Sequence, residues 1–116
     1  MKLNKLSFDT SKGSELKIQH PEIKDVELTV TLRDPLSLDY KRSVGEASRI
    51  VYQAFEDKTL ANVMLEAVSS IKDWDIDDNK CDMDTMIDLF KKQDYQWIAI
   101  SVYDHMFAKK FLGMKI

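Results

Sequence analysis

Residues 64–74 read MLEAVSSIKDW, and residues 82–112 read DMDTMIDLFKKQDYQWIAISVYDHMFAKKFL. From Leu60 to Ile71, apolar residues recur at every third or fourth position. This period is typical of a helix with one buried face, and Trp74 continues it by three residues. We therefore predict a helix whose tryptophan end closes the core.

The second stretch predicts two further helices. Asp82 or Asp84 can cap a short helix that runs through Lys92, and a longer helix begins near Asp94. The longer helix is apolar on two sides, which is typical either of a central core helix or of a helix whose second side binds a partner. One side comprises Tyr95, Ile98, Val102 and Met106, and the other comprises Trp97, Ile100, Tyr103, Phe107 and Phe111.

The N-terminal part predicts a β-hairpin. Residues 1–14 are expected to be a flexible lead-in that ends in a polar, glycine-containing loop. Apolar and polar residues then alternate until His20 and Pro21 interrupt them, and they alternate again over residues 26–32. An isolated hairpin is marginal in water, so we expect helices to cover its apolar face.

Helical spacing follows the hairpin. Asp34 or Ser37 can cap a first helix, which contains Gly45, and Thr59 is expected to cap the next one after a break at residues 56–58. A glycine inside a helix costs about 1 kcal/mol relative to alanine, unless it permits a close helix contact.

The predicted fold class is α+β and mainly α, with an N-terminal β-hairpin packed on a bundle of about four helices. The hairpin is assigned to residues 15–33 and the helices to residues 34–116, and residues 15–116 are expected to form a single domain. A length of 116 residues fits one modest core.

Composition argues against several classes of protein. The net charge of −3 and the lack of a basic cluster argue against a nucleic-acid partner. The longest apolar runs fall far short of the roughly 20 residues that a bilayer span needs, so no membrane association is expected. Cys81 is the sole cysteine, which excludes an intrachain disulfide and suits a reducing interior.

No residue set resembles an active site, so we expect no enzyme activity, no catalytic residues and no cofactor. The acidic connector, residues 73–84, places carboxylates at positions 1, 3, 5 and 12 of a calcium-loop pattern. Asp78 stands where that pattern requires glycine, Lys80 where it has an apolar residue, and Asp84 where it has glutamate. We therefore expect no metal site, and a small calcium-responsive helix-loop-helix binding module stays an alternative.

The C-terminal end is the candidate partner-binding surface. It combines lysines with apolar side chains and has no acidic residue after Asp104, and apolar groups of this kind favour docking onto another chain. Fraying of this end into solvent is the competing interpretation. The candidate residues are Phe107, Lys109, Lys110, Phe111, Leu112 and Met114.

The layout resembles the small tail assembly chaperones of long-tailed bacteriophages, from residue 15 nearly to the end of the chain. The likeness is carried by the strand ending in His-Pro (residues 18–21), the amphipathic strand (26–32) and the Ser-x-x-Tyr helix start (37–40). The Asp-Trp pair at 73–74, the acidic connector, the DMDTMIDLF helix and the closing helix continue it. The glycine and proline that the family commonly has before the third helix are missing here.

The resemblance implies a non-catalytic protein that binds the tape measure protein and recruits tail tube subunits during virion assembly. It also implies location in the cytoplasm of the infected bacterial host, absence from the mature virion, and self-association into a homo-oligomer. An uncharacterised structural or regulatory phage protein is a further alternative, because it would share the layout without these partners.

Overall fold

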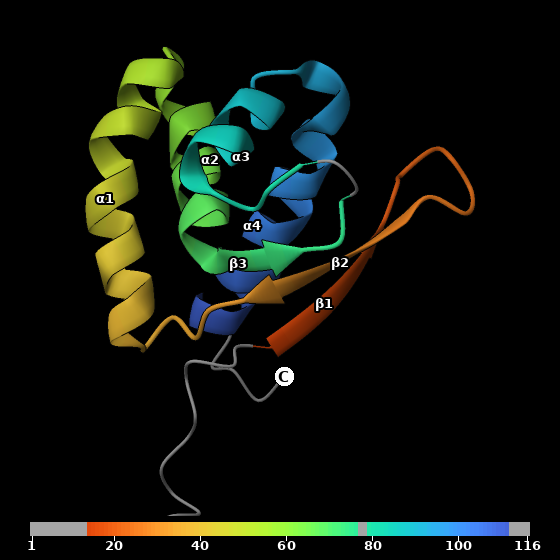
Figure 1. The fold of residues 1–116 in the computed structure, drawn as a ribbon, viewed down its shortest axis with the longest axis horizontal. Coiled ribbons are helices and arrows are strands. Elements are labelled where there is room, and N and C mark those ends of the chain that lie inside the picture. The colour runs from red at the N-terminus through yellow and green to blue at the C-terminus, as the bar shows by residue number, and fades with distance from the viewer. Residues whose placement is uncertain (1–13, 77–78, 112–116) are drawn as a thin grey trace, which may run out of the picture.

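The computed structural model describes residues 14–76 and 79–111, with side chains up to residue 108. Within these residues a three-stranded antiparallel sheet packs against helices, so the predicted α+β, mainly α fold class is confirmed (Figure 1). The elements in chain order are β1 (Ser14–Gln19), β2 (Glu27–Leu32), α1 (Leu38–Ala54), α2 (Lys58–Ser70), β3 (Ile71–Trp74), α3 (Met83–Phe90), the 3-10 helix η2 (Gln93–Tyr95) and α4 (Gln96–Phe111).

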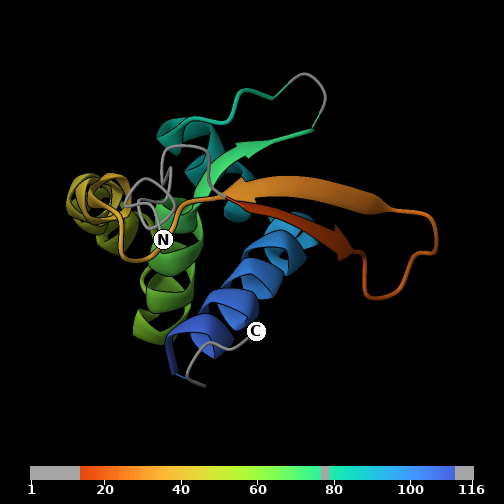
Figure 2. The ribbon, with the colours of Figure 1, turned by 90° about the horizontal axis from the view of Figure 1, so that it is seen from below.

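The predicted hairpin is present. β1 and β2 pair antiparallel, with Leu16 opposite Val30 and Ile18 opposite Leu28 on the face toward the helices. The alternation seen in the sequence decides this, because every second residue of a strand points to the same face. The loop end of the hairpin projects beyond the helices (Figure 2).

The assignment of residues 34–116 to helices, their breaks and their connector misses one strand. The chain leaves the helix after Ser70 and forms β3, which pairs antiparallel with β2 and makes the sheet order β1-β2-β3. Ile71 lies opposite Leu32 and Asp73 opposite Thr31, so Lys72 is an extra residue in a β-bulge. The tryptophan end predicted for the second helix is therefore a strand end.

The helix starts follow their capping side chains. Ser37 Oγ accepts from the Tyr40 backbone N–H, and Asp82 Oδ1 accepts from that of Thr85, so these two of the proposed caps are confirmed. The cap of α2 is Asp57, which accepts from the Leu60 N–H, and not Thr59. A carboxylate suits this place because it faces the positive end of the helix dipole.

The core lies between the inner face of the sheet and α2, α3 and α4. Val30 and Leu32 from the sheet are fully buried, together with Met64 of α2, Phe90 of α3 and Met106 of α4. The α2 helix is central: it packs against both α1 and α4, and β3 continues directly from its end (Figures 1 and 2).

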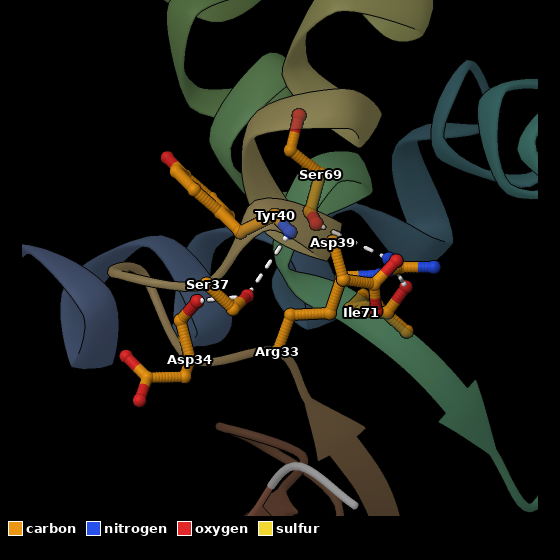
Figure 3. A network of polar contacts seen from close by, with 7 residues as sticks. All are labelled: Arg33, Asp34, Ser37, Asp39, Tyr40, Ser69 and Ile71. Carbon is orange, nitrogen blue, oxygen red and sulfur yellow. Dashed lines mark hydrogen bonds and ion pairs between the residues drawn. The ribbon is translucent and has the colours of Figure 1, made fainter. Parts of the chain in front are cut away.

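A polar network joins the end of β2 to the junction of α2 and β3 (Figure 3). Arg33 Nη1 donates to the carbonyl oxygens of Ser69 at 3.2 Å and Ile71 at 2.7 Å, and its Nε lies 3.0 Å from Asp39 Oδ2. The last carbonyls of a helix have no partner within the helix and carry partial negative charge, so a guanidinium there stabilises the helix end. This network fixes where β3 leaves α2.

Candidate interaction surface

One side of α4 carries apolar side chains that the core does not bury. Ile98, Val102 and Met106 are at most 2% exposed, whereas Ile100 and Phe107 are 46% and 45% exposed. Tyr103 lies between these two and is partly exposed, and its ring centroid is 6.1 Å from that of Phe107. Ile100, Tyr103 and Phe107 follow each other by three and four residues, so they share one helix face. We call these three residues the α4 outer face.

The structure shows which of the two apolar sides of α4 faces the core. The side that includes Ile98 belongs to the core, although Tyr95 at its beginning is 41% exposed. Among its described side chains, the other side is partly buried near its start, where Trp97 packs against the core. An apolar helix side of this kind is costly to leave in water, and it is typical of a surface that another protein covers.

The hairpin loop is joined to the start of α4 through His20. The imidazole of His20 lies against Trp97, with ring centroids 5.1 Å apart, and its Nδ1 accepts from the backbone N–H groups of Glu22 and Ile23. The predicted turn at His20 is therefore ordered by this imidazole. Beyond it, Asp25 has a φ of 67° and Ile23 is 55% exposed.

The structure places only part of the candidate C-terminal surface. Phe107 is exposed on α4, as expected for a partner-binding side chain. Lys109, Lys110 and Phe111 belong to the last turn of α4, but their side chains lie outside the described part of the chain, as do Leu112 and Met114 entirely. The sequence placed Ile100 and Tyr103 on the same helix side as Phe107. It did not assign them to the binding surface, because spacing alone does not tell which side the core covers.

The acidic connector does not have the structure of a calcium loop in its described residues. It is entered from strand β3, so the helix-loop-helix arrangement of the alternative reading is not formed. Asp75 Oδ1 accepts from the Thr29 backbone N–H at 2.9 Å, and Asp82 caps α3. Within residues 14–76 and 79–108, no three His, Cys, Asp or Glu side chains are grouped so that they could hold a metal ion.

Cys81 is a free, partly buried thiol that packs against the core. Burial raises the pKa of the Cys81 thiol from 9.0 to about 12, and the negative charges of Asp73 and Asp82 act in the same direction. Arg33 opposes this shift. The thiol is therefore protonated at neutral pH, and a protonated thiol is a poor nucleophile.

No protein-family model, curated protein or solved structure matches this chain. In the part of the chain that the structure describes, every helix is too short or too polar to cross a membrane.

Proposed function

We propose that this protein is a non-catalytic tail assembly chaperone of a long-tailed bacteriophage, which binds the tape measure protein and recruits tail tube subunits during virion assembly. Two things support the proposal: the sequence resemblance, and the apolar outer face of α4. The second carries it, because it provides a place where a hydrophobic partner would bind.

The chemistry of the α4 outer face favours a helical partner. Ile100, Tyr103 and Phe107 are spaced like the seam residues of a coiled coil, whose side chains insert between those of a facing helix. Aromatic side chains are also the most frequent anchors of protein interfaces. A tape measure protein is long, helical and apolar, so it needs a partner that covers its hydrophobic stripe until tube subunits replace that partner.

The experiment is co-expression with the tape measure protein that is proposed as the partner, followed by measurement of that protein's soluble fraction. Wild-type chaperone should raise the soluble fraction, and Ile100→Asp should abolish the effect because it places a charge in the interface. Ile50→Asp is the matched control, since Ile50 is an isoleucine on α1 with 37% exposure.

Each variant must first show an unfolding midpoint close to that of the wild type. An equal soluble fraction with Ile100→Asp and with wild type would contradict binding through α4. Failure of the wild-type chain to keep the long protein soluble would contradict the function itself.

The proposal also includes a location and a fate. The protein would act in the cytoplasm of the infected host and leave before the particle is complete, so mass spectrometry of purified virions should not detect it at stoichiometric amounts. Its stoichiometric presence there would instead support the alternative of a structural phage protein. An open reading frame directly upstream of the tape measure gene is the expected gene position.

A further inference from the structure

The open side of the sheet is the backbone edge of β1. The strand order places β1 at one end of the sheet, and in the described residues no helix or strand runs along its outer side (Figures 1 and 2). An edge strand presents backbone N–H and C=O groups that can pair with another strand.

The hydrogen-bond pattern identifies which groups face outward. The backbone N–H of His20 donates to the carbonyl oxygen of Val26 at 2.9 Å, so the backbone groups of His20 face β2. Along an antiparallel strand, the backbone N–H and C=O groups of successive residues face alternate sides of the strand. The backbone groups of Ile18 and Leu16 therefore also face β2. The backbone groups of Glu15, Lys17 and Gln19 are consequently turned to the open edge, and the side chains of these three residues are exposed on the outer face of the sheet.

We propose that two copies of this chain pair through these edges, antiparallel about a two-fold axis at Leu16, which joins two three-stranded sheets into one. In this register Leu16 lies opposite Leu16 of the second copy, and Glu15 lies opposite Lys17 of the second copy. By symmetry the Glu15–Lys17 ion pair occurs twice in the dimer. In each pair, the outward backbone groups of the two residues face each other across the interface.

Charge selects this register over its neighbours. An axis at Lys17 would place the two lysines opposite each other, and an axis at Glu15 would do the same for the two glutamates. Like charges directly opposite each other on one sheet face are destabilising, whereas opposite charges stabilise the pair. An axis at Ile18 would leave Lys17 opposite the uncharged Gln19. Only the axis at Leu16 gives both charges of the strand an opposite partner.

The resemblance implies self-association without naming an interface, and what is inferred here is the interface. It is separate from the α4 outer face, so each can fail without the other. A lysine on an edge strand can also serve to prevent edge pairing. That reading predicts a monomer, and the test below distinguishes the two.

The experiment is sedimentation equilibrium of the full-length chain over a concentration series. Wild type should shift from monomer to dimer as concentration rises. Glu15→Lys and Lys17→Glu should each raise the dimer dissociation constant by a factor of about ten or more, because each substitution creates two like-charge pairs. The double variant Glu15→Lys/Lys17→Glu should restore dimerisation, since it exchanges the two signs.

Matched controls and a local measurement complete the test. Glu22→Lys and Lys24→Glu make the same charge changes in the hairpin loop and should leave the dimer intact. In the dimer, amide hydrogen exchange at Lys17 should slow with rising concentration, because its N–H gains an acceptor.

A monomer at every concentration overturns the proposal, as does a dimer that both single reversals leave unchanged. Loss of the dimer in Phe107→Asp with no effect of the β1 reversals would place the interface on α4 instead.

Discussion

The Arg33 guanidinium donates a 2.7 Å hydrogen bond to the carbonyl oxygen of Ile71, the residue at which α2 ends and β3 begins. The same group reaches Ser69 O and Asp39, and the Arg33 backbone N–H donates to Ser70 O at 2.7 Å. Arg33 thus connects the end of β2, the first turn of α1 and the end of α2 (Figure 3).

Replacing Arg33 should therefore destabilise the fold. Arg33→Met keeps the apolar stem but leaves two partly buried carbonyls without this donor, so we expect a loss of about 1.5–3 kcal/mol in the free energy of unfolding. Urea unfolding measures it, with Arg49→Met on the exposed part of α1 as the control. Equal stability of the two variants would show that the network does not hold the β3 junction.

Trp74→Ala should be among the most destabilising single changes. Trp74 is 8% exposed, its ring meets that of Phe90 edge to face at 6.3 Å, and its Nε1 donates to Asn79 O at 2.9 Å. Removal of a buried aromatic side chain costs about 3–5 kcal/mol. Chemical denaturation measures this, and a loss below about 1 kcal/mol would be incompatible with a buried ring.

Gly45→Ala should stabilise the protein. Gly45 lies inside α1 and is exposed, and an added Cβ would meet no atom of the described residues within 4 Å, so these residues make no close helix contact that would justify a glycine. The gain should be about 0.5–1 kcal/mol from helix propensity. A thermal unfolding midpoint that falls instead of rising would contradict the placement of Gly45.

The Cys81 thiol should react slowly and should make stability depend on alkaline pH. Its folded pKa is about 12 against an ordinary 9.0, so folding favours the protonated thiol. This contribution is complete below pH 9.0 and is lost as pH rises from 9.0 to 12. At pH 8, alkylation by iodoacetamide should be at least tenfold slower, roughly, in the folded protein than in urea.

Comparison with Cys81→Ala isolates the alkaline effect from lysine and tyrosine titration. The wild type should lose more stability than Cys81→Ala over that pH window. Equal alkylation rates in folded and unfolded protein would show that the thiol is not shielded.

Local signals explain which parts of the fold could be predicted from sequence. The β2 alternation and the caps Ser37 and Asp82 depend only on neighbouring residues, and the structure agrees with them. β3 was missed because Ile71 and Trp74 are three residues apart and both buried, which mimics helical spacing. The bulge at Lys72 brings them to the same face of a strand, and its cause is pairing with β2, about forty residues earlier in the chain.

The candidate surface was predictable in part for a similar reason. Two apolar sides on α4 were visible in the spacing. Phe107, assigned from sequence to the partner-binding surface, is an exposed side chain, and its role in binding stays a prediction. Which side faces the core depends on the packing of α4 against α2, and that is a tertiary contact. Ile100 and Tyr103 could therefore be joined to Phe107 as a surface only from the structure.

The most direct test of the α4 outer face as the partner-binding surface is site-specific photocrosslinking in cells that co-express the tape measure protein. Tyr103 is replaced by p-benzoylphenylalanine, which preserves an aromatic ring at the centre of the surface. Tyr52, 44% exposed on α1, is replaced in the same way as the control. We predict a crosslink to the tape measure protein from position 103 and none from position 52. A crosslink from position 52 alone, or from neither position while the two proteins co-purify, would contradict the account.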